Sequence, residues 1–118
     1  MIEIDNEFVV VCDIDDTLVM WNDEYKQPHA GAMAFLDPYD GSTNYLTPHQ
    51  KHIDLLRKFK GRGMCVIIWS AAGTQWAKSV INTLGLADFV DVIMTKPSKY
   101  IDDLVRAEDI LGSRIYLK

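Results

Sequence analysis

The sequence has few cysteines, no excess of basic charge and no long hydrophobic run. Cys12 and Cys65 are too few for a thiolate zinc site, and both lie in apolar stretches, so we expect reduced, buried thiols. With 12 basic and 17 acidic residues the net charge is −5, which argues against a nonspecific nucleic-acid binder. Without a membrane-spanning run or a signal peptide, we expect a cytoplasmic protein with no membrane partner.

The overall composition predicts one ordinary globular domain. The chain has 118 residues, of which 48% are hydrophobic and 25% are charged. These values are typical of a globular protein with a core of useful size. There are no repeats, low-complexity tracts or linkers, so we expect a single domain over residues 1–118.

The most informative stretch places three carboxylates directly after an apolar, β-branched run. Residues 8–12 predict a buried strand, and Asp13, Asp15 and Asp16 follow it at once. Buried strands do not hold such charges, so we expect them where the strand leaves the sheet, which is where α/β proteins bind ligands. In extended geometry Asp13 and Asp15 share one face, where one could attack as a nucleophile while the other moves a proton. An acidic turn after an edge strand is the structural alternative.

The remaining pattern alternates helices with strands. A hydroxyl cap and a proline at Thr47-Pro48 predict a helix start, and Gly61 and Gly63 predict its end. A strand over residues 64–69, a helix from Gly73-Thr74 to Gly85 and a strand over residues 90–94 follow. Such alternation predicts an α/β fold with parallel βαβ units.

A long irregular connection follows the acidic motif, over residues 19–46. Connections of this length in small domains are usually functional or mobile, so this segment is either a flap over the site or a plain surface loop. Trp21 is the best candidate for stacking on a substrate, whereas we expect Trp69 and Trp76 in the core. The histidines lack the spacing of a metal site, and we expect His49 and His52 on a solvated helix face.

Polar residues also follow the other predicted strands. Ser70 ends the second strand, where its hydroxyl can donate to a phosphoryl oxygen or simply cap a turn. Lys96 follows the third strand and can offset the carboxylates or hold a phosphate; Lys99 is the competing candidate. Close carboxylates repel one another unless a cation offsets them, and Mg²⁺ prefers such oxygen ligands.

In this order, the DIDDT motif, the serine, the lysine and the acidic pair Asp102-Asp103 resemble the haloacid dehalogenase (HAD) superfamily, specifically its phosphatase branch. The resemblance spans nearly the whole chain, although only the first motif is specific by itself. It implies a three-layer, Rossmann-like (HAD-like) α/β domain with a mostly parallel sheet of about five strands. It also implies a capless member, since neither connection has room for a full cap domain.

The resemblance further implies a Mg²⁺-dependent phosphatase that works through an aspartyl-phosphate. Asp13 would be the nucleophile, Asp15 the general acid and base, and Thr17 a support for the loop, while Ser70 and Lys96 would bind the phosphoryl group. Mg²⁺ would be held by Asp13, by the main-chain carbonyl of Asp15 and by Asp102 or Asp103. Positioning and charge neutralisation are what phosphoryl transfer mainly requires.

The match is strained near the end of the chain. Only five residues separate Lys96 from Asp102, and a parallel crossover needs a dozen or more. Either a very short fourth strand at Tyr100-Ile101 brings the acidic pair to the site, which we favour, or residues 98–111 form a helix leading to a strand at 114–117.

The resemblance leaves the substrate and the partners open. Capless members act on accessible phosphoesters, here a phosphorylated small molecule such as a nucleotide or sugar phosphate, or a nucleic-acid end. Others close the site with a partner subunit, so a homo-oligomer is one alternative. Two other functions stay open: a phosphoacceptor regulatory domain and a HAD-fold binding protein without catalysis.

Overall fold

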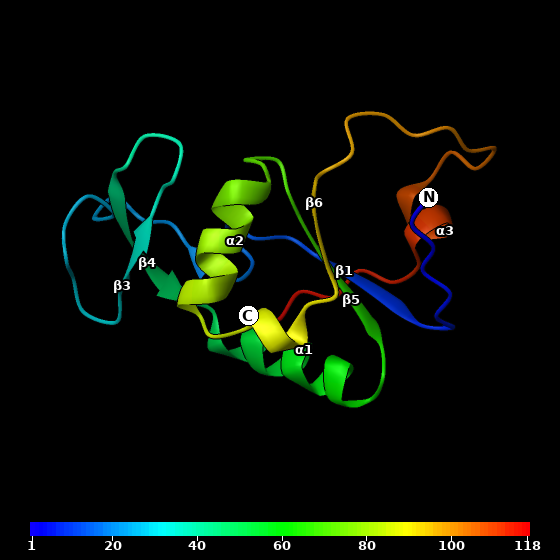
Figure 1. The fold of residues 1–118 in the computed structure, drawn as a ribbon, viewed down its shortest axis with the longest axis horizontal. Helices are drawn as coiled ribbons and strands as arrows, with labels where there is room; N and C mark the ends of the chain where they lie inside the picture. Colours follow the sequence, from blue (N-terminus) through cyan, green and yellow to red (C-terminus); the bar gives the residue numbers. More distant parts are fainter.

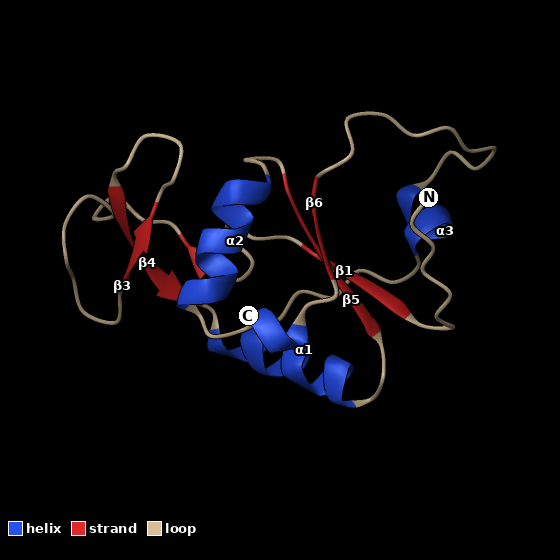
Figure 2. Cartoon of the chain, viewed as in Figure 1, coloured by secondary structure: helices blue, strands red, loops and turns tan.

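The chain forms two small β-sheets that share one hydrophobic core (Figure 1). The structure, a computed structural model, describes residues 1–118 and measures 45 × 30 × 30 Å. The parallel sheet has the order β1 (Val9–Cys12), β5 (Cys65–Ser70), β6 (Val92–Thr95). The antiparallel sheet has the order β2 (Val19–Met20), β4 (Thr43–Pro48), β3 (Met33–Leu36). The helices are α1 (Gln50–Gly61), α2 (Thr74–Thr83), the 3₁₀ turn η1 (Ala87–Phe89) and α3 (Ala107–Leu111) (Figure 2).

The prediction of about five mostly parallel strands in a three-layer Rossmann-like sheet is wrong. The parallel sheet has three strands, and the other three strands form a separate antiparallel sheet. Residues 19–46 turn back on themselves through glycines at positive φ, including Gly41 at +76°, and a hairpin pairs its strands antiparallel. Residues 96–118 contribute no strand, and apart from the short helix at residues 107–111 they are irregular.

The start of the first long helix also differs from the prediction. Thr47 and Pro48 still belong to β4, where they pair with Met20 and Val19. Helix α1 therefore begins at Gln50, with His49 as its N-cap. This shift of the boundary brings His49 to the first turn of the helix, facing His52.

All the helices are short, the longest being α1 with 12 residues. None of them combines the length and the apolar character needed to cross a membrane. Helices α1 and α2 each bury one face, and α2 contributes Trp76, Ala77, Val80 and Ile81 to the interior.

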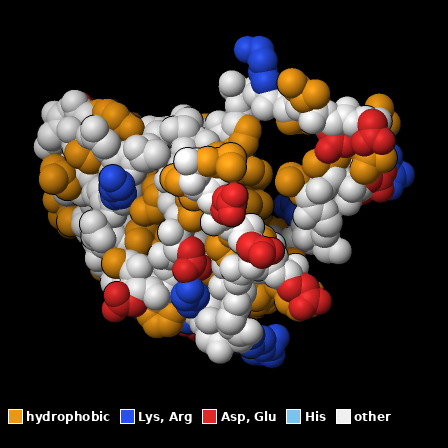
Figure 3. Space-filling model, turned by 45° about the vertical axis from the view of Figure 1, so that its right-hand side comes forward, with side chains coloured by type: hydrophobic (Ala, Val, Ile, Leu, Met, Phe, Trp, Pro, Cys, Tyr) orange, Lys and Arg blue, Asp and Glu red, His pale blue; other side chains and the backbone are white.

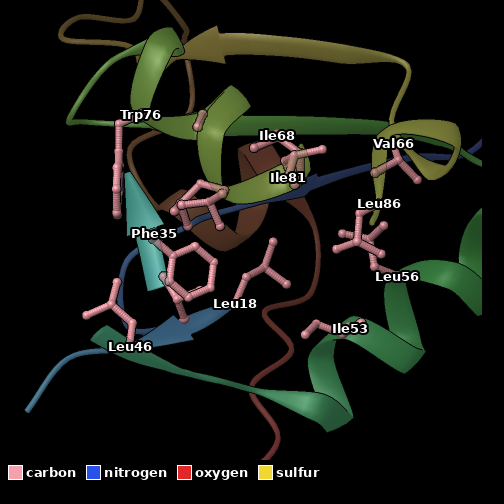
Figure 4. Close-up of a cluster of buried hydrophobic side chains, with 14 residues drawn as sticks. Leu18, Phe35, Leu46, Ile53, Leu56, Val66, Ile68, Trp76, Ile81 and Leu86 are labelled. Atoms are coloured by element: carbon pink, nitrogen blue, oxygen red, sulfur yellow. The ribbon is translucent and has the colours of Figure 1, made fainter. Parts of the chain in front are cut away.

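The core unites the two sheets (Figure 4). Phe35 and Leu46 from the antiparallel sheet are fully buried and belong to the same cluster as Ile68 of β5 and Ile81 of α2. The picture places Phe35 beside Leu18, which follows the acidic motif. Residues 19–46 are thus not a plain surface loop, because their side chains help to close the core.

Candidate active site

The carboxylates of the first motif lie on a tight turn at the end of β1, here called the acidic loop (residues 13–17). The carbonyl of Ile14 accepts hydrogen bonds from the backbone N–H groups of Thr17, Leu18 and Val19, at 3.2, 2.9 and 3.3 Å. Ile14 and Leu18 are fully buried and anchor the turn. Asp16 has a φ of +58°, a conformation that is rare outside glycine and that clusters at functional sites.

Two of the other predicted site residues, Lys96 and Thr17, contact the Asp13 carboxylate. Lys96 Nζ lies 3.8 Å from Asp13 Oδ1, and the Thr17 hydroxyl donates to Asp13 Oδ2 at 3.4 Å. The Asp13 side chain is 32% exposed, so a ligand can reach it. Lys99, the competing lysine, is exposed and makes no ion pair. The strand that leads to Asp13 is an edge strand and is only half-buried, unlike the buried strand that we expected.

Asp15 is held by two indole rings. The N–H groups of Trp21 and Trp76 donate to the same oxygen, Asp15 Oδ1, at 2.9 and 3.0 Å. Its other oxygen, Oδ2, accepts no hydrogen bond from the protein. Trp76 is buried, as the sequence predicts, but the sequence did not indicate its contact with Asp15. Trp21 packs between Trp76 and Tyr25, with centroid distances of 6.1 and 5.2 Å.

Ser70 lies at the end of β5, next to the acidic loop in the sheet. It is 1% exposed, and its hydroxyl oxygen accepts the N–H of Ala72 at 3.1 Å. Its carbonyl accepts the N–H of Lys96 at 3.0 Å, which ties the backbone of Lys96 to β5. Ser70 is therefore a turn residue whose O–H remains free to donate.

The acidic pair Asp102-Asp103 lies outside this group. Both residues are exposed in the irregular segment between β6 and α3, and Asp102 Oδ1 accepts the N–H of Leu104 at 2.9 Å. No group of three acidic, histidine or cysteine side chains is close enough to hold a metal ion. Neither the short strand at 100–101 nor a helix starting at residue 98 with a following strand is present, because only residues 107–111 are helical.

A cavity of about 660 Å³ adjoins the acidic loop. Asp13, Asp15 and Lys96 line it together with apolar side chains of β1 and α1, and the segment after α3 forms another wall. Figure 3 shows the molecule hollowed between its main body and the segment that carries α3. The carboxylates thus face a space large enough for a small phosphoester.

The thiol beside Asp13 is not a competing nucleophile. Burial, reinforced by the negative charge of Asp13, raises the pKa of Cys12 to about 12. Cys12 is therefore protonated at neutral pH, and its Sγ donates to the Asp13 carbonyl at 3.3 Å. Both cysteines are free, so no disulfide constrains the loop.

Two histidines that the sequence did not indicate as site residues support the loop. His52 is 6% exposed, so the expectation of a solvated face is wrong. Its Nδ1 lies 2.7 Å from the carbonyl oxygen of Thr17. His49 stacks on it, with ring centroids 3.7 Å apart. The only signal in the sequence was their i, i+3 spacing, which places both on one helix face.

Comparisons with protein-family models, curated proteins and solved structures returned no match. The resemblance to the HAD superfamily therefore rests on the sequence motifs of this chain alone.

Proposed function

We propose that this protein is a Mg²⁺-dependent phosphatase, related to the phosphatase branch of the HAD superfamily, that hydrolyses phosphomonoesters. The observation that supports this most is the pairing of Asp13 with Lys96, 3.8 Å apart, beside Asp15 and an open cavity. Asp13 is accessible to a ligand, and the neighbouring Lys96 ammonium can offset the negative charge of a phosphoryl group. Asp15 has one oxygen fixed by hydrogen bonds and one oxygen free for a proton.

The reaction proceeds in two steps. In the first, a carboxylate oxygen of Asp13 attacks phosphorus, the bond to the ester oxygen breaks, and Asp15 donates its proton to that leaving oxygen. In the second, Asp15 takes a proton from water, the resulting hydroxide attacks phosphorus, and the bond to Asp13 breaks. The products are an alcohol, inorganic phosphate and the original carboxylate.

The surrounding residues position the phosphoryl group and offset its charge. The Lys96 ammonium lines the cavity beside Asp13, where it can pair with the phosphoryl oxygens. Ser70 is buried and does not line this cavity, so a hydrogen bond from its O–H to the phosphoryl group would require a shift of the turn after β5. Thr17 orients the nucleophile through its bond to Asp13 Oδ2. Trp21 donates its indole N–H to Asp15, and contact of its ring with a substrate is a further part of this proposal.

The donor set fits a weakly held Mg²⁺. The Asp13 carboxylate and the Asp15 carbonyl, which accepts no backbone hydrogen bond, are hard oxygen donors two residues apart in the chain. Mg²⁺ commonly keeps several waters and binds through one or two carboxylates and the substrate phosphate. When bound, it would neutralise charge on the phosphoryl group. Asp102 and Asp103, the other expected ligands, lie outside this set.

The substrate we propose is an accessible phosphomonoester of the cytoplasm. A nucleotide or a sugar phosphate fits the net charge of −5 better than a nucleic-acid end does, because a polyanion would be repelled. A homo-oligomer that closes the open cavity is a further part of this proposal.

The direct test is hydrolysis of p-nitrophenyl phosphate with and without Mg²⁺. We expect turnover that requires Mg²⁺, that Asp13→Asn abolishes, and that the exposed control Asp23→Asn leaves unchanged. Trapping of ³²P on the wild-type protein but not on Asp13→Asn would support the covalent intermediate. Equal activity of wild type and Asp13→Asn would refute the proposed nucleophile.

A phosphate-binding protein without turnover is the second candidate. The exposed positions of Asp102 and Asp103 favour it, since they leave the metal with fewer protein ligands. Calorimetric titration with Mg²⁺ and with inorganic phosphate distinguishes the two. Binding of both, with no hydrolysis of any phosphoester in a panel, would support the binding protein.

A further inference from the structure

His49 and His52 form hydrogen bonds to the backbone of Leu117, which lies 65 residues beyond His52 in the chain. The N–H of Leu117 donates to His52 Nε2 at 2.8 Å, and His49 Nε2 lies 2.8 Å from the Leu117 carbonyl oxygen. Both backbone groups of one residue are therefore bound by a pair of stacked rings.

The bonding partners determine the protonation state of both rings. A backbone N–H can only donate and a carbonyl can only accept. His52 Nε2 receives an N–H, so it carries no proton, and the proton of the ring must sit on Nδ1, which donates to the Thr17 carbonyl at 2.7 Å. In His49 the proton is on the other nitrogen. Its Nδ1 accepts the N–H of His52 at 3.2 Å, so its Nε2 carries the proton. Both rings are neutral.

The same segment touches the acidic loop a second time. The Tyr116 hydroxyl donates to the carbonyl of Asp16 at 2.9 Å, and its ring packs edge-on against His52 at 4.9 Å. Lys51 Nζ also donates to the carbonyl of Lys118 at 2.7 Å. The carbonyls of two neighbouring loop residues, Asp16 and Thr17, are thus held from one side, next to the strained φ of Asp16.

We propose that His52 is a positioning residue that sets the acidic loop through the Thr17 carbonyl, and that Leu117 fixes the ring tautomer which His52 needs for this role. The kinetic part of this inference rests on the proposed phosphatase activity. The coupling runs from the Leu117 N–H through the His52 ring to Thr17, whose hydroxyl reaches Asp13. A small misplacement of a nucleophile is enough to slow a reaction about 10²-fold.

Two substitutions of His52 separate its two hydrogen bonds. In His52→Asn the amide nitrogen takes the place of Nδ1 and still donates to Thr17, but nothing reaches Leu117. In His52→Gln the amide takes the place of Nε2 and can still accept from Leu117, but the donor to Thr17 is lost. We expect His52→Gln to lower kcat by about 10- to 100-fold with KM unchanged, and His52→Asn to stay within about threefold of wild type. A purely structural role predicts equal effects of the two variants.

Substitution of Leu117 tests the other half of the coupling. Leu117→Pro removes the N–H and keeps the carbonyl, whereas the matched control Leu117→Ala keeps both. We expect Leu117→Pro to lower kcat in the wild-type background but to have no further effect in His52→Asn, where the donor is an amide and needs no tautomer. Additive effects of the two substitutions would overturn the proposal.

A spectroscopic measurement keeps this test separate from the proposed function. Long-range ¹H–¹⁵N spectra of the full chain should show the proton of His52 on Nδ1 and that of His49 on Nε2. Leu117→Pro should weaken the preference for the Nδ1–H tautomer of His52, so that a fraction of the Nε2–H tautomer becomes detectable, and should shift the amide signals of residues 15–17. A proton on His52 Nε2 in the wild type, or unchanged signals in Leu117→Pro, would overturn the coupling whether or not the protein hydrolyses phosphoesters. Absence of hydrolysis with these spectra as expected would refute the phosphatase alone.

Discussion

The indole nitrogen of Trp76 lies 3.0 Å from Asp15 Oδ1, although 61 residues separate the two in the chain. Trp76 stands on the buried face of α2 and Asp15 on the turn that follows β1. A buried indole N–H needs an acceptor, and here the acceptor is the carboxylate that we propose as the general acid and base. The packing of the core and the orientation of this carboxylate are therefore linked.

Removal of this indole N–H should affect poor leaving groups most. Trp76→Phe keeps an aromatic ring but loses the donor, so Asp15 is held by Trp21 alone. Protonation of the leaving oxygen matters for an alkyl phosphate and little for p-nitrophenyl phosphate. We expect kcat to fall about 10-fold for the alkyl ester and less than threefold for the aryl ester. An equal loss on both substrates would contradict the role of Trp76.

Hydrolysis of p-nitrophenyl phosphate should require Lys96 but not Lys99. Only Lys96 lies beside Asp13, where its charge offsets the phosphoryl oxygens. We expect Lys96→Met to lower kcat for p-nitrophenyl phosphate by about 10²-fold or more, as loss of a donor to a developing charge does. Lys99→Met, a change of the same charge at an exposed site, should leave kcat unchanged. A reversed order would assign the phosphate contact to Lys99.

Gly73 should tolerate no side chain. It caps α2 with a φ of +97° and a ψ of 171°, a combination that is essentially restricted to glycine. A Cβ at this position would also meet the hydroxyl of Tyr39, from the loop between β3 and β4. We expect Gly73→Ala to lower the free energy of unfolding by about 1–3 kcal/mol in urea titrations.

The controls for Gly73 separate the strain from the contact. Gly61→Ala, in ordinary helical geometry with open space around it, should be neutral or slightly stabilising. Tyr39→Ala in the Gly73→Ala background should recover the part of the loss that comes from the contact. No loss in Gly73→Ala would mean that the cap has a different conformation in solution.

The ion pair between Lys60 and Asp91 should make stability depend on pH. The hydrogen bond from Lys60, and next that from the N–H of Val66, hold the pKa of Asp91 below its ordinary value. A lowered pKa stabilises the fold above the unfolded pKa of about 3.9, and this contribution is lost as the pH falls through the folded value. Each side chain is 33% exposed, so solvent screens the pair.

The expected result is a pH-dependent difference between wild type and Asp91→Asn. The free energy of unfolding of the variant should be about 1 kcal/mol lower than that of wild type at pH 7. This difference should stay constant down to about pH 5 and should decrease as the pH falls below about 4. Asp88→Asn, in the neighbouring turn, serves as the control and should match wild type. A difference that is as large at pH 3 as at pH 7 would mean that the charge of Asp91 is not its cause.

Much of the local structure around the site could be predicted from the sequence. The apolar run before Asp13 predicted β1, and the alternation of residues 64–94 predicted β5, α2 and β6 within a few residues. These elements depend on periodicity and on local stop signals, which a sequence displays directly. The neighbourhood of Asp13 and Lys96 follows from them, because parallel strands end at the same edge.

The failures concern pairing between distant segments. The number of strands in the sheet was overestimated because residues 19–46 close as an antiparallel unit and residues 96–118 add no strand. The positions of Asp102 and Asp103 depended on that missing strand. The sequence predicted a solvated position for His49 and His52, because a helical pattern does not indicate that the segment around Leu117, 65 residues after His52, will cover them.

The sequence by itself determined where the residues of the proposed chemistry lie in the chain: aspartates at the end of one strand, a serine after the next strand and a lysine after the third. Only the tertiary structure decided which groups surround them, namely two indoles on Asp15 and a histidine between Thr17 and Leu117. The physical reason is that charge and periodicity are local properties of a chain. The hydrogen-bond partner of a buried polar group, in contrast, depends on which distant segment packs beside it.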